Sequence, residues 1–368
     1  IAVLPIFGAI GGAIAGYLIK NTAPAAKGSG VSQIMGFLRH KKVPMNIKVG
    51  LIKLLSGIIA IGSGFPLGPE GPSVQMGGSV AWQMAKWLKA PVAFRRVIVA
   101  AGGGAGIAAV FSAPLGGFVY AIEELLNSAR PVILLLVIIT TFIADSTAVF
   151  LQGGINEPTY KIDFLFSGFD FIYLILLGAI IGVFAECYSK YILMMQNLGK
   201  KLYKNKFVLK MSICGFILGS IYSVLGDEFH NLDNLKKMIA TQTDIDIRLA
   251  ILTVFVLFIT SGLAAASGAP GGLFYPMLIL GGAIGLILGS WFWVPNTALS
   301  TYIFAGMGAF VAGCSRTPIT AMFLAFALTK NLLIMKPVLI SCITSFLLAR
   351  AFNEESIYER QIKIELED

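Results

Sequence analysis

The stretch Gly62-Ser63-Gly64-Phe65-Pro66-Leu67-Gly68-Pro69-Glu70-Gly71-Pro72 decides the fold of this chain, because it interrupts an apolar region with glycines, prolines and one carboxylate. A related stretch begins 204 positions after Ser63 and reads Ser267-Gly268-Ala269-Pro270-Gly271-Gly272-Leu273-Phe274-Tyr275-Pro276. Glycine lets backbones approach closely, and proline is tolerated in the first turn of a helix. Both stretches therefore predict helices that begin inside the apolar part of the molecule.

An internal repeat connects the two stretches, and it keeps the same offset without a gap as far as Pro114 and Pro318. Many transporters consist of two such halves, and helices broken at corresponding positions mark their substrate site. The connection Lys86–Arg96 is basic, whereas its counterpart Val294–Ser300 carries no basic residue, which is compatible with halves of opposite orientation. The matches include Pro66 with Pro270, Gly68 with Gly272, Gly77-Gly78 with Gly281-Gly282, and Trp87 with Trp291.

The composition predicts a membrane protein. Of 368 residues, 57% are hydrophobic and 13% are charged, whereas soluble domains carry about 25% charged residues. Long apolar segments lack a polar face, and several reach the roughly 20 residues that span a bilayer. We therefore expect an all-α polytopic membrane protein, an inverted repeat of tilted and broken helices. The segments are Ile1–Ile19, Val97–Ala113, Pro131–Phe150, Phe169–Met195, Phe207–Leu225, Leu249–Ala266 and Leu333–Leu348.

The net charge of +9 is unevenly distributed and predicts the topology. Basic loops usually stay in the cytoplasm, so we expect three connections inside and two mixed or acidic ones outside. Short lysine clusters beside spans are routine, and no nucleic-acid partner is predicted. The inner connections are Arg39–Lys42, Lys86–Arg96 and Lys190–Lys210, and the outer ones are Gln152–Asp163 and Gly226–Asp246.

Neither a metal site nor a cofactor is predicted. The four cysteines are scattered singly through apolar segments, and there are only two histidines, His40 and His230. An intramembrane hydrolase using Ser63 or Ser267 would lack a base, because both histidines fall in connections. We therefore do not expect an enzyme.

Three predicted helix starts offer a site for a small anion. They lie near Glu70-Gly71, at Leu273-Phe274, and at Gly28-Ser29-Gly30-Val31 before a short helix expected at Ser32–Leu38. Free N–H groups and the positive end of a helix dipole favour an anion at such places. None of the three carries Lys or Arg, and an anion that must leave again is better held by partial charges. The Ser29 hydroxyl adds a donor.

Glu70 is the predicted gate. A carboxylate inside a membrane protein is a functional hypothesis by default, and this one competes with an anion for the same amides. Capping of its own helix is the simpler interpretation, but the repeat partner of Glu70 is Phe274, so the acid is specific to one half. Glu123 and Glu124 end another apolar segment, where acids usually face interfacial water. Proton transport needs a second titratable group, which favours a role for one of them.

Four segments together resemble the CLC family of chloride channels and chloride/proton antiporters. GSGVS around Ser29 is similar to the family's GSGIP, GPEGP around Glu70 to GREGP, and GGLFYP around Leu273 and Phe274 to GGIFAP. Tyr358 lies in SIYERQ, where the family places an anion-coordinating tyrosine. The segments follow the family order, and the resemblance covers essentially the whole chain.

The resemblance implies chloride transport in exchange for protons. Glu70 would be the gating glutamate, which blocks an anion position when ionised and swings out when protonated. Glu124 matches the internal proton-transfer glutamate of the antiporter branch. The hydroxyls of two residues and the amides of several others would bind the anion. These anion-binding residues are Ser29, Gly30, Val31, Gly71, Leu273, Phe274 and Tyr358, together with the position that Glu70 occupies.

The family fold further implies a first transmembrane repeat over 1–151, an extracellular connection over 152–167, a second repeat over 168–352, and a pore helix with the cytoplasmic end over 353–368. Further family helices are expected before Ile1, and no cytoplasmic regulatory domain after the last helix, as in prokaryotic members. We expect a multi-pass homodimer in a bacterial cell membrane, with the bilayer, chloride and protons as its partners.

Two departures and three alternatives accompany this interpretation. Pro69 replaces the family's usual Arg and removes one N–H from the outer end of the site, and Ser32 replaces a Pro. A passive anion channel is disfavoured by Glu124, and a fluoride exchanger by Ser29, because that branch usually carries Met there. An organic-solute transporter would need a site larger than three converging helix ends.

Overall fold

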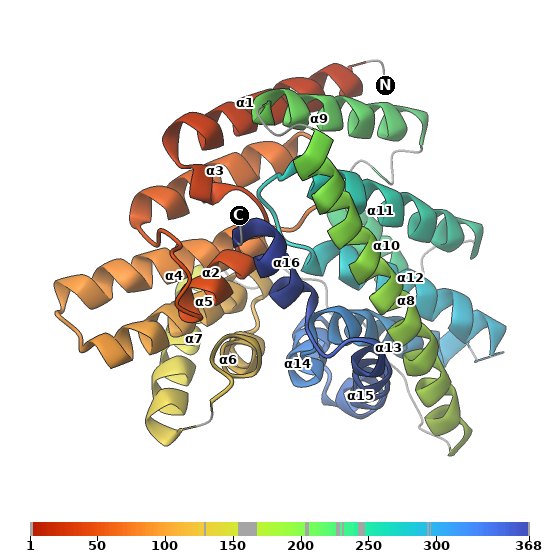
Figure 1. Ribbon diagram of the computed structural model, residues 1–368. Helices are drawn as coiled ribbons and strands as arrows, with labels where there is room; N and C mark the ends of the chain where they lie inside the picture. Colours follow the sequence, from red (N-terminus) through yellow and green to blue (C-terminus); the bar gives the residue numbers. More distant parts are fainter. Residues whose placement is uncertain are drawn as a thin grey trace.

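The computed structural model describes residues 3–128, 130–153, 168–202, 206–225, 229, 232–241, 247–292, 294 and 296–366. Within these ranges the chain is helical, and its one β pairing is an isolated bridge between Gly68 and Gly272 (Figure 1). The elements are α1 (Leu4–Thr22), η1 (Pro24–Ala26), α2 (Val31–Leu38), α3 (Ile47–Gly62), α4 (Glu70–Trp87), α5 (Val92–Phe111), α6 (Pro114–Tyr120), η2 (Ala121–Leu126), α7 (Pro131–Leu151), α8 (Gly168–Leu202), α9 (Phe207–Val224), α10 (Leu232–Thr241), α11 (Ile247–Ser267), α12 (Phe274–Trp291), α13 (Asn296–Ser315), α14 (Pro318–Thr329), η4 (Leu332–Ile334), α15 (Met335–Phe352) and α16 (Ile357–Leu366).

The helix boundaries reproduce the sequence repeat. Four pairs of helices begin exactly one offset apart, which confirms the repeat in three dimensions. The left-handed backbone recurs as well, since Gly64 and Gly268, and likewise Ser112 and Arg316, all have positive φ. The pairs are α4 with α12, α5 with α13, α6 with α14, and α7 with α15.

The two halves meet at the bridge between Gly68 and Gly272. Gly68 N–H donates to the Gly272 carbonyl at 2.9 Å, and Gly272 N–H donates to the Gly68 carbonyl at 2.8 Å. Equivalent residues that exchange both hydrogen bonds must lie on either side of a two-fold axis. From this bridge α4 and α12 run to opposite sides of the molecule (Figure 1). The expected inverted repeat is therefore confirmed.

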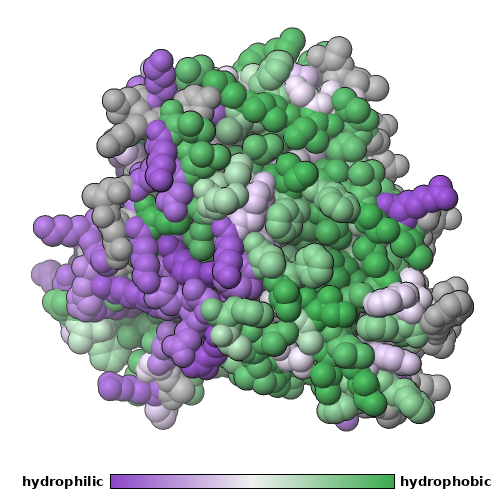
Figure 2. Space-filling model, turned by 45° about the vertical axis from the view of Figure 1, so that its right-hand side comes forward, coloured by the Kyte–Doolittle hydropathy of each residue, from purple (hydrophilic) through white to green (hydrophobic). Residues whose placement is uncertain are grey.

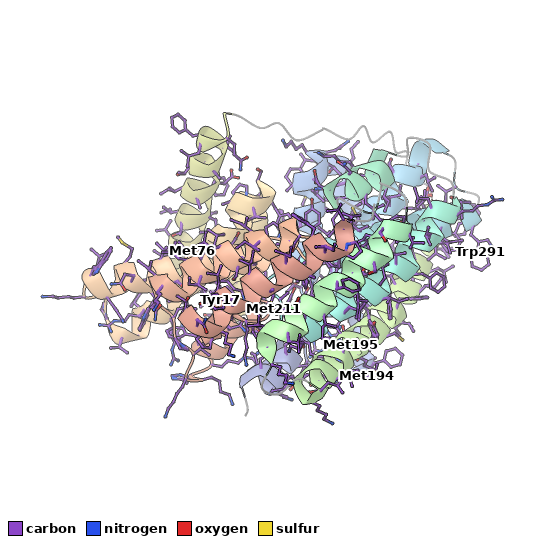
Figure 3. All side chains as sticks on the ribbon, turned by 90° about the horizontal axis from the view of Figure 1, so that it is seen from above. Tyr17, Met76, Met194, Met195, Met211 and Trp291 are labelled. Carbon is purple, nitrogen blue, oxygen red and sulfur yellow. The ribbon has the colours of Figure 1, made fainter. Side chains whose placement is uncertain are left out.

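Glycines also bring α1 and α9 together. A Cβ added to Gly8 would overlap the Gly215 carbonyl, and one added to Gly12 would overlap the Met211 carbonyl. Seen from above, the two helices lie side by side with Met211 where they meet (Figure 3). Backbone contacts of this kind are typical of helix packing in membranes, where small residues permit close approach.

Nine of the helices described above are long and apolar enough to cross a membrane. All the predicted apolar segments are among them. The surface in Figure 2 is mostly hydrophobic, with the hydrophilic residues gathered on one side of the view. The sequence did not single out α13, which is nearly enclosed by protein and lies at the centre of the second half. Most of the outer connection predicted at Gln152–Asp163 lies outside the described residues, whereas the one predicted at Gly226–Asp246 contains the helix α10.

Candidate anion site

Three helix starts converge at one point, as expected. A Cβ added to Gly71, in the first turn of α4, would overlap the Ser29 carbonyl and lie 3.0 Å from the Gly272 nitrogen. A Cβ added to Gly30, before α2, would overlap the Gly71 carbonyl. Glycine is therefore required for the starts of α2, α4 and α12 to meet. The first of these helices begins at Val31, one residue earlier than predicted.

Glu70 lies between two of these helix starts. It is the first residue of α4 and is fully buried. Its Oε1 accepts a hydrogen bond from the Tyr275 N–H of α12 at 3.3 Å, whereas Oε2 has no hydrogen-bond partner among the described residues. A Cβ on Gly68 or Gly272 would overlap the carboxylate. The acid therefore reaches the start of the helix in the other half, where the dipole favours negative charge.

The ring of Phe274, the first residue of α12, lies between two tyrosines. Tyr358 of α16 stacks on it with centroids 5.8 Å apart, and Tyr120 of α6 meets it edge to face at 5.9 Å. Both tyrosines are fully buried, and neither hydroxyl has a hydrogen-bond partner in the described part of the chain. Buried hydroxyls normally have a partner, so both are suited to meet a ligand. Tyr120 was not identified from the sequence, although its position four residues before Glu124 was a usable signal.

Ser29 belongs to a hydrogen-bonded group at the start of α2. The Ser32 hydroxyl donates its one proton to Glu365 Oε2 at 2.6 Å. In the 3.2 Å contact between the hydroxyls of Ser32 and Ser29, Ser29 is therefore the donor. That proton can turn to an anion instead. The Gly30 N–H donates to Gln33 Oε1 at 2.6 Å and is therefore already occupied.

A buried cation lies directly behind this group, which the sequence did not indicate. Lys53 of α3 is fully buried and its Nζ donates to the carbonyls of Gly28 at 2.5 Å and Lys27 at 3.2 Å. Glu365 is the nearby acid, and burial raises the pKa of this carboxyl although the Ser32 hydroxyl and the Lys53 ammonium oppose the effect. The three helix starts thus lack a cation of their own, but one supports the loop of Ser29.

Glu123 and Glu124 have different environments. Glu124 is buried, and its Oε1 accepts from the Ser356 hydroxyl at 3.1 Å. Ser356 in turn caps α16, because its hydroxyl accepts from the Glu359 N–H at 3.2 Å. Glu123 instead accepts from the Thr320 N–H at 2.8 Å and caps α14. Glu124 is therefore joined to the helix that carries Tyr358, whereas Glu123 is a structural acid.

Comparison with known proteins identifies the family. The family described as "Voltage gated chloride channel" matches residues 11–350. This chain belongs to that family. It is 31% identical over 357 residues to the H(+)/Cl(-) exchange transporter ClcA of Vibrio parahaemolyticus, covering 94% of this chain and 76% of the relative. It is 28% identical to the ClcA of Cronobacter sakazakii, over 96% and 78% of the two chains.

Solved structures agree with this assignment. A slow cyanobacterial Cl-/H+ antiporter superposes with a TM-score of 0.91 at 27% identity, covering 100% of this chain and 88% of the other. A eukaryotic CLC transporter, at 23% identity and a TM-score of 0.83, covers 98% and 65% and shares the fold. The CLC-type fold is thereby confirmed, and the chain is an integral membrane protein.

The two serines considered for a hydrolase lie at helix ends in this CLC-family chain. Ser63 Oγ donates to the Ala60 carbonyl at 2.9 Å, and Ser267 Oγ donates to the Ala264 carbonyl at 2.6 Å. Both serines therefore close the last turn of α3 and α11, the same role in the two halves. His40 contacts Arg96 on the exposed surface.

Two cavities flank the converging helix starts. One of about 390 Å³ is lined by Gly64, Pro69 and Tyr275 beside Glu70. The other, about 720 Å³, is lined by Gly268, Glu365 and five lysines. Gly64 and Gly268 are repeat partners, so the inverted repeat places equivalent residues at opposite mouths. The lysines are Lys27, Lys200, Lys201, Lys210 and Lys363.

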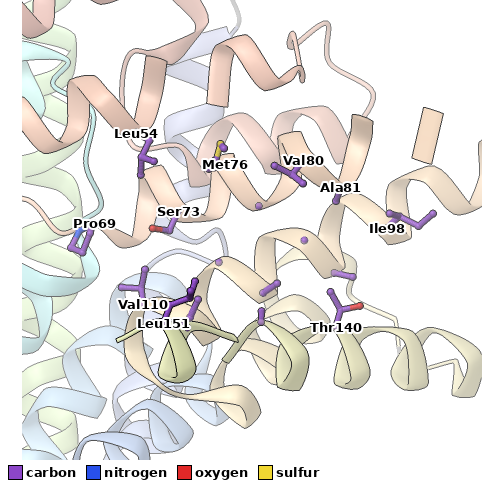
Figure 4. Close-up of a pocket in the computed structure, with 18 of the residues that line it drawn as sticks. Leu54, Pro69, Ser73, Met76, Val80, Ala81, Ile98, Val110, Thr140 and Leu151 are labelled. Carbon is purple, nitrogen blue, oxygen red and sulfur yellow. The ribbon is translucent and has the colours of Figure 1, made fainter. Parts of the chain in front are cut away.

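A third cavity has a volume of about 920 Å³ (Figure 4). Leu54, Met76, Val80 and Ile98 project into it from α3, α4 and α5, and Leu151 comes from α7. No ionisable side chain lines it. Pro69 also lines it, but an apolar lining without charged groups does not favour the binding of a small hydrated ion.

Asp233 of α10 lines the cavity of about 390 Å³. It accepts a hydrogen bond from the Tyr275 hydroxyl at 2.6 Å and pairs with Lys237 at 2.8 Å and Lys236 at 3.1 Å. Partial burial acts to raise the pKa of Asp233, but these hydrogen bonds and lysines outweigh it and lower the pKa to about 2. Tyr275 thus joins Glu70, through its N–H, to α10, through its hydroxyl. Asp233 was not predicted from the sequence.

Proposed function

We propose that this protein exchanges chloride for protons across a membrane, with Glu70 as the gate. The observation that carries the proposal is the Glu70 carboxylate, which is buried between two cavities and accepts a hydrogen bond from the first turn of α12. A chloride ion would seek the same amides. The names of the exchangers and of the antiporter similar to this chain support the same activity.

The exchange follows because the Glu70 carboxylate and chloride compete for the same helix starts. While Glu70 is ionised, its carboxylate occupies the helix starts and blocks the anion. Protonation removes the charge, and the neutral side chain yields the position to chloride. Ser29 and Tyr358 would then donate their hydroxyls to the ion, while Val31, Gly71, Leu273 and Phe274 offer backbone amides. The Gly30 amide, which was expected to join them, would first have to leave Gln33.

The lysine-lined cavity is the proposed cytoplasmic mouth. Its basic residues agree with the positive-inside rule and would raise the local concentration of chloride. Protons would arrive separately through Glu124, which lies away from that cavity. Two routes that meet only near Glu70 allow one ion to be driven by the other.

Two copies are proposed to form a homodimer in which each subunit has its own pathway. The proposed division of the chain is a first repeat over 1–151, an outer connection over 152–167, a second repeat over 168–352 and a C-terminal segment over 353–368. The matching starts of α4 and α12, and of α7 and α15, support these boundaries.

Liposomes that contain the purified protein test the proposal. An outward chloride gradient should drive protons inward, against their own gradient if necessary, and a pH electrode records the uptake. Chloride flux without proton uptake would instead establish a passive channel. Proton uptake driven by fluoride far better than by chloride would establish a fluoride exchanger.

A further inference from the structure

Three buried polar atoms on residues close to Phe274 have no hydrogen-bond partners among the described residues. They are Glu70 Oε2 from α4, the Tyr358 hydroxyl from α16 and the Tyr120 hydroxyl from α6, and all three residues are fully buried. Buried hydroxyls normally have a hydrogen-bond partner. The proposed exchange assigns roles to Glu70 and Tyr358 but none to Tyr120.

Tyr120 is close enough to both acids of the proposed exchange to interact with them. It ends α6, and Glu124 follows on the continuous π-helical segment η2, about one helical turn later. On its other side the Tyr120 ring contacts Phe274, whose neighbour Tyr275 binds Glu70. Both carboxylates act electrostatically on the Tyr120 hydroxyl, Glu124 more strongly than Glu70. Tyr358 also interacts with Tyr120.

We propose that the Tyr120 hydroxyl relays protons between Glu124 and Glu70. A hydroxyl can accept one hydrogen bond while it donates another. A proton that leaves Glu124 through an intervening water binds the Tyr120 oxygen as the original O–H bond breaks toward Glu70. Rotation about the C–O bond then restores the starting hydroxyl. One proton moves from one carboxyl to the other, and Tyr120 is neutral before and after.

Tyr120 and Tyr358 differ in how they are linked to Glu124. Tyr358 stacks face to face on Phe274 and sits on the helix capped by Ser356, whereas Tyr120 shares its own helix with the proton-transfer acid. If Tyr120 were instead a third hydroxyl ligand of the anion, its removal would weaken chloride binding and leave the ratio of protons to chloride unchanged.

Tyr120→Phe removes only the hydroxyl and tests the relay, which rests on the proposed exchange. Proton uptake should fall at least about tenfold, since a positioned proton donor contributes roughly 100-fold or more, while chloride flux stays within about twofold and the chloride Kd measured by calorimetry is unchanged. Tyr302→Phe is the matched control, because that buried hydroxyl donates to Asp170 at 3.0 Å. It should leave coupling intact.

Glu124→Gln and the wild type are measured in parallel. If the wild type couples protons to chloride and Glu124→Gln does not, but Tyr120→Phe couples normally, the relay is wrong and the exchange stands. A changed chloride Kd with normal coupling overturns the relay and makes Tyr120 an anion ligand. If the wild type moves no protons, the proposed exchange itself fails. Calorimetric chloride binding by Tyr120→Phe shows that the variant is folded.

Discussion

The Glu70 carboxylate is bound unevenly, because Oε1 accepts a backbone N–H whereas Oε2 has no hydrogen-bond partner among the described residues, a balance suited to a group that must move. A carboxylate locked by several donors would be a fixed structural charge, as Glu123 is with its contacts to Thr320. Glu186 illustrates the other extreme, because Arg316 and Arg360 both bind it, the latter through two hydrogen bonds at 2.8 and 3.0 Å. These buried acids therefore differ in mobility for a reason visible in their partners.

Glu70→Gln imitates the protonated gate. We expect chloride flux that no longer drives protons and that varies little between pH 5 and 8, whereas wild-type flux rises as pH falls because protonation frees the helix starts. Paired chloride-electrode and pH-electrode recordings from liposomes measure both quantities. Tight proton coupling in this variant would place the gate at another residue.

Glu124→Gln and Glu123→Gln form a matched pair of neighbouring substitutions. The first should reduce proton uptake at least about tenfold, as expected for loss of a positioned acid, with chloride flux still measurable. The second should retain coupling but lower stability by about 1 kcal/mol, because a charged cap of α14 becomes neutral. Thermal unfolding in detergent reports the stability. Unchanged coupling in Glu124→Gln would reduce that residue to an ordinary buried carboxyl.

The residues whose roles could be predicted are those whose adjacent residues in the sequence already indicate the role. Ser29, Glu70 and Phe274 stand beside glycines and prolines that start helices, so the broken helices and their convergence followed from local sequence. Asp233 and Lys53 act through residues far away in sequence, Tyr275 and the Gly28 carbonyl respectively. Such pairs depend on the packing of helices and leave no local pattern.

Among the elements, the helix starts impose the tightest packing. Gly71→Ala should abolish transport and lower stability by about 1–3 kcal/mol, the usual effect of overpacking, because the new Cβ would overlap the Ser29 carbonyl. Gly62→Ala, near the end of α3, is the matched control, since a Cβ there meets no atom within 4 Å. Chloride flux and thermal unfolding of the two variants provide the comparison. Equal behaviour would mean that the starts of α2 and α4 do not touch.

The contact between α10 and α12 is stabilised by Asp233 over a defined pH range. The pKa of Asp233 is lowered to about 2, from about 3.9 in an unfolded chain. Its contribution to stability is therefore complete above pH of about 4 and is lost as pH falls toward 2. We expect Asp233→Asn to leave the rise of chloride flux between pH 8 and 5 unchanged. A flattened pH profile in this variant would make Asp233, and not Glu70, the group that titrates.

At the scale of the whole molecule, α13 is the long helix of the second half that was not predicted from its apolar sequence. This helix is rich in Gly, Ala, Ser and Thr and is almost entirely enclosed by protein, so it needs no continuous lipid-facing stretch of large apolar residues. The repeat offset was the available signal for it, because α5 of the first half had been recognised from its apolar sequence.

The orientation of the molecule can be tested with two exposed positions. After replacement of the native cysteines, Gln152→Cys should react with a membrane-impermeant maleimide on intact cells, whereas Lys89→Cys should react only after permeabilisation. Both side chains are exposed, so access depends on the side of the membrane alone. The reverse pattern would place the basic connection Lys86–Arg96 outside and would contradict the assignment of the two mouths.

The reciprocal bridge between Gly68 and Gly272 has an electrical consequence. Because α4 and α12 leave it in opposing directions, their dipole moments, which are vectors, largely cancel. Their electrostatic potentials at the bridge are scalars of the same sign, and these add. The centre of the protein is thus strongly attractive to anions, while the pair of helices couples little to the voltage across the bilayer. Any sensitivity of transport to membrane voltage must then come from the charges that move, the ions themselves and the side chain of Glu70.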